Sequence, residues 1–538
     1  MTGLQKNPWV VLVVLCTGFF MILLDLTIVN IAIPSILKGL HATLDQILWV
    51  LNGYILSYAV LLITAGRLGD LYGQKRLFQA GMLLFTLASG LCGFAQDSNQ
   101  LIAARVLQGV GGAVMTPQTL AILVTIFPPE RRGAAFGVWG GVAGIASVTG
   151  PTLGGFIVTY ADWRWIFYVN LPIGALALLA GWFIIPDLRP GRRHGLDLAG
   201  VVLASAGLFA VVFGLIEGQR YDWGAVWGPL SIAEIIGAGV ALIAIFVWWE
   251  SRQREPLMPL SLFRERNFSL MNWTSAALNF GMLGIFLPFI IYLQSVLGMT
   301  PLQAGLTMMP MSLLSMPLAP IAGRLSDRIG GKYILLVGLT LFAASTVYLA
   351  GAARTDSTWL TFLPGVLLAG AGMGCTFAPM VTVAMRNIQP QMAGAASGVM
   401  NTVRQLGGAL GGAIVGAVLQ NRLASTLHDE ASSRASALPP QFQRPFVNAF
   451  DNVARSGFEL GRGQSGAALP SGIPPSLQAQ LQQLFHDVFV NAYVSAMRPT
   501  MAASAAVLLL AALSCLAIRR RRGPAAEVRL REAPAPAA

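Results

Sequence analysis

Apolar stretches long enough to cross a bilayer recur from one end of the chain to the other, and this pattern limits the fold more than any other feature. There are about fourteen of them, close to or above the roughly 20 residues that a spanning helix needs. Only 11% of the residues are charged, whereas soluble domains carry about 25%. Because lipid offers no hydrogen-bond partners to a backbone, we expect an all-α polytopic membrane protein. The expected spans are residues 9–37, 47–66, 77–95, 100–127, 133–158, 165–185, 197–217, 229–250, 268–293, 302–323, 332–351, 358–384, 393–420 and 497–518.

Basic residues gather in every second loop. Clusters such as Arg131–Arg132 and the tail Arg519–Arg522 alternate with short loops that carry few basic residues. Because Lys and Arg are enriched in cytoplasmic loops, both termini are expected in the cytoplasm, as an even number of spans requires. The net charge of +12 then reports orientation rather than a nucleic-acid-binding surface. We expect a multi-pass protein of a prokaryotic inner membrane.

Two copies of the pattern G-R-L-x-D-x-x-G-x-K lie in equivalent loops, at residues 66–75 and 323–332. The copies are eight spans apart, although two six-helix halves would place them six spans apart. Two helices inserted between the halves explain the difference. We therefore expect a six-helix bundle in residues 1–190, two inserted helices in 191–255, and a second six-helix bundle with a basic cytoplasmic tail in 256–538.

One carboxylate, Asp25, lies near the middle of the first span. A charge at that depth costs at least about 2.5 kcal/mol on insertion scales, so it usually faces a protein interior or a water-filled cavity. A carboxylate in such a place can bind and release a proton, and a nearby arginine or a cationic cargo would favour its ionised form. Asp25 is therefore the first candidate for a proton-coupling site. The alternative is a structural carboxylate bonded to neighbouring helices.

Five short motifs follow one another in the order found in a known family. They are residues 24–34 in the first span, 66–76 after the second, 105–109 in the fourth, 150–155 in the fifth and 163–174 at the start of the sixth. With the span count and the repeat, they make the chain similar to the major facilitator superfamily, and within it to the 14-helix drug:proton antiporter branch (EmrB/QacA-type). The resemblance implies two six-helix bundles, each an inverted repeat, plus two inserted helices.

The resemblance also implies roles for residues within the spans. Arg105, whose guanidinium stays charged at working pH, would hold water or a carboxylate and tune the proton affinity of Asp25. The fifth-span motif would sit between the halves and seal them against proton leak, and ordinary packing of small residues is the alternative. Its members are Gly150, Pro151, Gly154 and Gly155.

The repeated loop motif is expected to work as a gate. Glycines permit a tight turn and close helix approach, and its aspartate can bind a helix N-terminus or a loop arginine. The resemblance gives Asp70 the role of a latch on the cytoplasmic side, with Arg76 as its partner. Simple anchoring by positive charge is the alternative. The gating residues are Gly66, Asp70, Gly73, Arg76 and, in the second copy, Asp327.

A substrate cavity is harder to derive from the sequence. Methionine and aromatic side chains form adaptable apolar walls, and aromatic rings can hold cations. Most aromatics in a membrane helix nevertheless face lipid or the core. The candidates for lining the cavity are Trp49, Asn52, Tyr58, Phe280, Phe286, Tyr292, Met308, Met309, Asn401 and Arg404.

The segment 421–496 interrupts the pattern of short loops. It is polar, but apolar residues recur at helical spacing from Leu477 to Phe489. This spacing suggests that the last helix extends outward and packs on something. A partly ordered surface loop and a lid over the outer mouth are both open.

These observations indicate a proton-coupled antiporter that exports amphipathic, often cationic, drugs or toxic small molecules by alternating access. No cofactor, metal or catalytic residue is expected: the four cysteines lie in separate spans without ligand spacing, and no GxxxxGK[ST] motif indicates an ATPase. The expected partners are the cargo, protons and lipid, with the protein a monomer and a further partner at segment 421–496 left open. The alternatives are an exporter of a lipid or endogenous metabolite, and a non-transporting receptor or scaffold.

Overall fold

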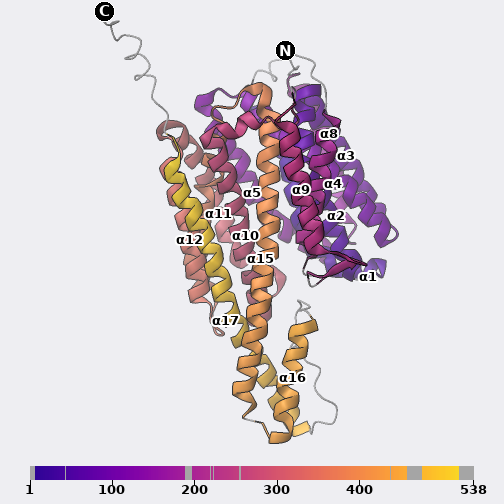
Figure 1. Ribbon diagram of the computed structural model, residues 1–538, viewed down its shortest axis with the longest axis vertical. Coiled ribbons are helices and arrows are strands. Elements are labelled where there is room, and N and C mark those ends of the chain that lie inside the picture. The colour runs from indigo at the N-terminus through magenta and orange to yellow at the C-terminus, as the bar shows by residue number, and fades with distance from the viewer. Residues whose placement is uncertain are drawn as a thin grey trace, which may run out of the picture.

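The computed structural model describes residues 7–42, 44–187, 197–218, 220–221, 223–253, 256–436, 438–456 and 475–519. The described chain is almost entirely helical (Figure 1). The helices are α1 (Pro8–Leu40), α2 (Leu44–Tyr72), α3 (Gln74–Phe94), α4 (Ser98–Ile126), α5 (Arg132–Tyr160), α6 (Trp165–Tyr168), α7 (Asn170–Ile184), α8 (Leu198–Glu217), α9 (Ile232–Glu250), α10 (Arg266–Ile291), α11 (Pro301–Ile329), α12 (Lys332–Ala352), α13 (Trp359–Gly374), α14 (Phe377–Met385), α15 (Ala393–Ala435), α16 (Pro440–Ser456) and α17 (Pro475–Ser514). A short hairpin of β1 (Ala225–Trp227) and β2 (Leu230–Ser231) links α8 to α9.

Helix starts follow local capping chemistry. The Asn7 side chain accepts a hydrogen bond from the Trp9 N–H at the start of α1, and Asp97 does the same for the Gln100 N–H in α4. At α11, Thr300 and Gln303 form a reciprocal capping box. Each cap satisfies an N–H group that the first turn of a helix leaves unpaired.

The expected spans are largely confirmed. Thirteen helical segments of the described chain are long and apolar enough to cross a membrane. The fourteenth expected span, 133–158, forms the 29-residue helix α5. The all-α membrane fold therefore holds, while a count of fourteen spans stays a prediction.

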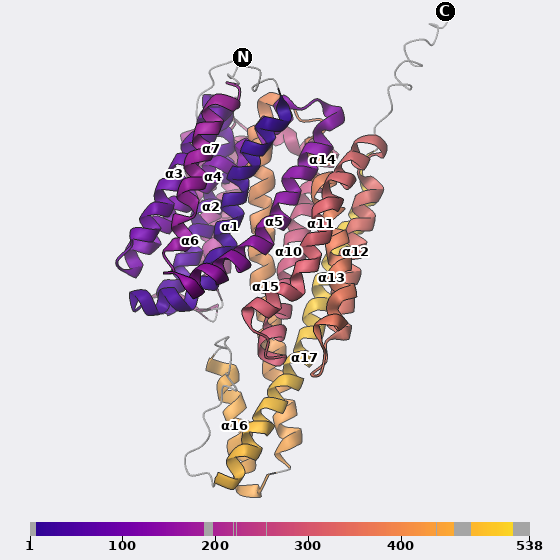
Figure 2. The ribbon, with the colours of Figure 1, turned by 180° about the vertical axis from the view of Figure 1, so that it is seen from behind.

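The two halves of the chain lie on opposite sides of the molecule (Figure 2). Helices α1 to α7 form one group, α10 to α14 and α17 form the other, and α15 runs between them. The halves meet where α5 packs on α11 and where α15 packs on α2. Helix α1 begins and α17 ends at one end of the bundle (Figure 1), and both copies of the loop motif lie at this end, which we call the loop-motif end.

The inserted helices α8 and α9 pack on each other, and α8 also contacts α2 and α15. Near the loop-motif end, the Trp249 indole N–H donates to the Asp197 carboxylate over 2.9 Å. At the other end, the Asn52 amide donates to the buried Glu217 carboxylate over 3.1 Å. The inserted pair is therefore fixed to the first half by a buried polar contact.

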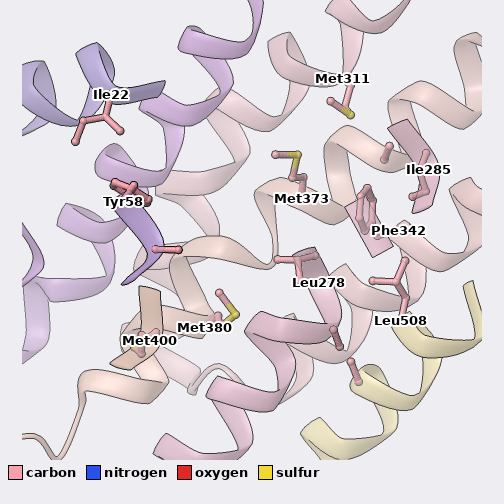
Figure 3. Packing of buried hydrophobic residues seen from close by; sticks show 14 of the residues in the cluster. Ile22, Tyr58, Leu278, Ile285, Met311, Phe342, Met373, Met380, Met400 and Leu508 are labelled. Atoms are coloured by element: carbon pink, nitrogen blue, oxygen red, sulfur yellow. The ribbon is translucent and has the colours of Figure 1, made fainter. Parts of the chain in front are cut away.

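The core is rich in methionine. Figure 3 shows Met311, Met373, Met380 and Met400 among buried aliphatic and aromatic side chains. Unbranched methionine fills irregular gaps between helices. The core is therefore tolerant of small shifts between packed helices.

The segment 421–496 departs from the expectation of a partly ordered loop. Helices α15 and α17 both continue beyond the bundle and, with α16, form a helical protrusion (Figures 1 and 2). In its core, Phe446 and Phe450 pack against Phe485 in a tilted arrangement, with ring centroids 4.9 and 4.8 Å away. The expected outward extension of the last helix is confirmed, because Leu481, Phe485, Val488 and Phe489 are buried.

The protrusion points away from the bundle along its long axis rather than lying across it (Figure 2). Among its described residues, no large hydrophobic side chain is exposed, whereas Leu410 and Ile414 are exposed on the part of α15 inside the bundle. Exposed apolar residues of a membrane-spanning helix face lipid, and the described side chains of the protrusion show no such face.

Candidate functional site

A closed polar network lies in the interior of the first half. The Arg105 guanidinium pairs with one oxygen of Asp25, and the Gln108 amide donates to the other oxygen over 2.8 Å. Arg105 also donates to the Gln108 carbonyl oxygen over 2.7 Å. All three side chains are fully buried. The structure thus brings together the two residues predicted to couple protons.

Gln108 was missed by sequence reasoning. It lies three residues after Arg105 on α4, and residues at this spacing share a helix face. A glutamine carries no charge, however, so nothing in its own chemistry marked it as part of a proton site.

Arg105 keeps further contacts that do not involve Asp25. Its Nε donates to the Val50 carbonyl over 3.2 Å, and its guanidinium lies 4.2 Å from the centre of the Tyr54 ring. A cation over an aromatic face is stabilised by the ring quadrupole. The arginine therefore has partners in place when Asp25 takes up a proton and loses its charge.

The buried ion pair of Asp25 and Arg105 predicts that substitutions at the two positions have non-additive effects on the free energy of unfolding. Removing one member of a buried ion pair leaves the other charge buried without a partner, which typically costs about 3–5 kcal/mol. Replacing both members by apolar residues is often tolerated. We expect Arg105→Leu and Asp25→Leu each to lower the free energy of unfolding by about that amount, and the double variant to recover most of it. Denaturant titration in detergent measures this cycle. Additive losses would contradict the pairing.

The two copies of the loop motif bind opposite halves of the protein in the same way. Asp70, at the end of α2, accepts hydrogen bonds from the backbone N–H groups of Gly394 (3.0 Å) and Ala395 (2.8 Å), at the start of α15. Asp327, at the end of α11, accepts from Gly133 (3.0 Å) and Ala134 (3.3 Å), at the start of α5. The positive end of a helix dipole favours an anion at this place. Each half thus caps a helix of the other.

The glycines of the motif are required by its geometry. Gly73 and Gly330 occupy equivalent positions and have φ angles of 100° and 85°, which side-chain-bearing residues rarely adopt. A Cβ atom on Gly66 would overlap the backbone of Gly394, and one on Gly323 would overlap that of Gly133. Close backbone contact between the halves at both places thus needs glycine.

The predicted partnership of Asp70 with Arg76 is wrong. Arg76 is exposed, and within the described chain no hydrogen bond or ion pair joins it to Asp70. Each of the two carboxylate oxygens accepts a hydrogen bond from a backbone N–H group instead. Pairing across the halves depends on tertiary contacts that the local sequence does not display.

The fifth-span motif packs mainly within its own half. A Cβ on Gly150 would overlap the Thr27 side chain, and one on Gly154 would come within 2.8 Å of Ile28. Gly155 has nothing within 4 Å of its Cβ position, so it takes no part in this packing. The placement of the Pro151 side chain lies outside the described part of the chain. The motif therefore supports α1 just after Asp25, and α5 meets the other half nearer the loop-motif end.

Gly150 is packed against Thr27 whereas Gly155 has open space beside it. Substitutions at these two positions therefore give a matched test of the packing between α5 and α1. We expect Gly150→Val to push α5 away from α1 and to lower transport by about tenfold or more, the equivalent of roughly 1.4 kcal/mol, because overpacking a helix contact costs about 1–3 kcal/mol. Gly155→Val should leave transport unchanged. Initial efflux rates at matched protein amounts measure both, and equal losses would contradict the packing.

Three predicted cavity residues belong to the packed interior instead. Tyr58 is buried and donates to Thr116 over 3.2 Å. Tyr292 is buried and donates to the Arg354 carbonyl over 2.5 Å. The Asn401 amide donates to the Ser397 carbonyl on its own helix. The polar atoms of these three residues form hydrogen bonds with neighbouring groups of the packed interior. Their assignment to a substrate cavity is therefore corrected.

The other cavity candidates are partly exposed. Trp49 lies 6.0 Å from the Phe213 ring of α8, and Asn52 binds Glu217, so both contact an inserted helix. The remaining half-buried candidates are Phe280, Phe286, Met308, Met309 and Arg404.

Comparison with known proteins agrees with this architecture. The model of the Major Facilitator Superfamily matches residues 15–412. The tetracenomycin C resistance and export protein of Streptomyces glaucescens is 36% identical over 409 residues, which cover 76% of this chain and 75% of that protein. The puromycin resistance protein of Streptomyces alboniger is 36% identical over 441 residues, covering 81% of this chain and 86% of its own length.

Solved structures share the fold at low identity. The human organic anion transporter MFSD10 has a TM-score of 0.61 at 12% identity, covering 95% of this chain and 99% of its own. The proton:xylose symporter XylE has a TM-score of 0.55 at 14% identity, covering 83% of this chain and 94% of its own. The family match, the resistance and export proteins among the relatives, and the shared fold lead to one conclusion: this chain belongs to the major facilitator superfamily and is a multi-pass membrane transporter, not an enzyme.

Proposed function

We propose that the protein exports amphipathic drugs or toxic small molecules in exchange for protons. The observation that carries this proposal is the fully buried carboxylate of Asp25, held by Arg105 and Gln108 in the middle of a spanning helix. A buried carboxylate with a built-in counter-ion can exist in a charged and a protonated form, which is what a proton-driven carrier needs. The named drug-resistance relatives support an exported small molecule as cargo.

The latches indicate which end of the protein is closed in this conformation. By the distribution of basic loops, the loop-motif end faces the cytoplasm. With Asp70 and Asp327 both bound, the halves are held together at this end. Export then proceeds as the halves rock: opening of the loop-motif end admits cargo from the cytoplasm, and its closure, with proton uptake from outside, releases cargo outward.

Efflux from proteoliposomes tests this function. Purified protein is reconstituted, loaded with puromycin or ethidium, and exposed to an imposed pH gradient of either sign. We expect drug to move against its concentration gradient only when protons flow in the opposite direction. Movement that ignores the pH gradient would exclude proton coupling, and no movement of any drug would exclude the export function.

A further inference from the structure

Arg404 is a charged side chain that the proton site and the latches leave unexplained. Three charged residues lie deep in the spans of the described chain, away from its loops and protrusion: Asp25, Arg105 and Arg404. Asp25 and Arg105 neutralise each other. The deep interior therefore has one positive charge in excess when Asp25 is ionised, and two when Asp25 is protonated.

Arg404 lies at the middle of the membrane. It is eleven residues from the start of α15, which is about 16 Å at 1.5 Å per residue and about half of a hydrocarbon core of roughly 30 Å. The side chain is half-buried, and no hydrogen bond or ion pair joins it to another described residue. A guanidinium cannot shed its proton there, so it must face water or an anion rather than lipid.

The faces of α15 show where Arg404 points. Gly398 packs on α2, and Gly407 and Gly411 pack on α10, whereas Leu410 and Ile414 are exposed toward lipid. At about 100° per residue, Arg404 falls between the α10-facing and α2-facing edges, on the arc away from Leu410. Because α2 and α10 belong to different halves, Arg404 lies on the side of α15 where the two halves meet.

We propose that Arg404 binds an anionic group of the cargo, so that the preferred substrates are amphipathic molecules that carry a carboxylate or a similar acidic group. This inference rests on the proposed export function and revises the expectation of often cationic cargo. Guanidinium is suited to the purpose, because its planar array of N–H donors matches a carboxylate in two-point contact. A cationic molecule would instead meet the excess positive charge of the interior.

An anionic cargo bound at Arg404 and a proton bound at Asp25 do not compete for the same charged group. Asp25 is occupied by Arg105 and Gln108, and a proton on Asp25 would by itself draw an anionic group inward. Exchange therefore has to come from the conformational change, with each conformation accepting one ligand, rather than from direct charge competition at Asp25.

A pair of dyes that differ at one group tests the proposal. Rhodamine 123 is the methyl ester of rhodamine 110, which carries a free carboxylate. We expect wild-type protein to bind rhodamine 110 about tenfold more tightly than rhodamine 123, measured by fluorescence polarisation in detergent. Arg404→Gln should lower the affinity for rhodamine 110 about tenfold and leave that for rhodamine 123 unchanged or improved. Arg404→Lys, which keeps the charge, should retain part of the preference.

Arg422→Gln provides the matched control, because Arg422 is an exposed arginine on the same helix and its loss should change neither affinity. Equal loss of both dyes in Arg404→Gln, equal affinities in wild type, or no binding of rhodamine 110 would overturn the proposal. Proton-driven efflux of puromycin or ethidium that persists beside any of these results would leave the export function standing, so the two failures are distinguishable.

Discussion

Asp25→Asn is expected to abolish concentrative drug transport. One pH unit supplies about 1.36 kcal/mol per proton, enough to accumulate a drug about tenfold for each proton exchanged. Asparagine has nearly the same size as aspartate and can still accept a hydrogen bond from Arg105, but it cannot carry the proton. Under a gradient of one pH unit, the accumulation ratio should fall from about ten in wild type to about one in the variant.

Controls separate a loss of coupling from a loss of folding. Asp25→Asn should still exchange labelled for unlabelled drug across a membrane without a pH gradient, because this exchange needs no net proton movement. Glu217→Gln removes another buried carboxylate, which binds Asn52 and Arg220, and should keep the full accumulation ratio. Tenfold accumulation by Asp25→Asn would place the proton site elsewhere.

Loss of both latches is expected to open the loop-motif end. Each aspartate accepts two backbone hydrogen bonds from a helix of the other half, and a hydrogen bond to a charged group contributes about 1.5–3 kcal/mol. Asp70→Asn/Asp327→Asn loses the charge and one acceptor at both places. The equilibrium should therefore shift toward the open conformation by several kcal/mol, with transport rates falling at least tenfold because closure becomes limiting.

Cysteine labelling measures this shift toward the open conformation directly. Ile63 is buried where α2 meets Gly398 of α15, so Ile63→Cys, in a chain without its native cysteines, is protected while the halves are closed. We expect a polar thiol reagent to label it slowly in the latched protein, at an intermediate rate in each single variant and rapidly in the double variant. Arg76→Gln should leave labelling unchanged, since Arg76 is exposed and does not contact Asp70. Unchanged labelling in the double variant would refute the latch.

The features that sequence reasoning predicted well are those that repeat or stand out from their surroundings. Apolar runs defined most helix bounds, and the repeated loop motif located both Asp70 and Asp327. Asp25 stood out because a charge near the middle of an apolar span is costly, and the resemblance to the major facilitator superfamily implied that Arg105 acts on it. The first of these signals is carried by the residue types themselves, and the second by the family motif.

The errors concern contacts between distant parts of the chain. Arg76 lies six residues after Asp70 in the same loop, but the helix N-terminus that binds Asp70 lies more than 300 residues away in sequence. Tyr58 and Tyr292 resemble cavity residues by type, and only their bonds to Thr116 and to the Arg354 carbonyl place them in the packed interior. Segment 421–496 was polar enough to resemble a loop because its apolar residues are few and gather in one small core.

Proton movement driven by a drug gradient is the most direct test of exchange at Asp25. Proteoliposomes containing a pH-sensitive dye are given a drug gradient with no initial pH difference. Wild-type protein should move protons against the direction of drug flow, so that the lumen changes pH until the two gradients balance, while Asp25→Asn moves drug with no pH change. Drug flow without proton movement in wild type, or equal proton movement in Asp25→Asn, would contradict this account.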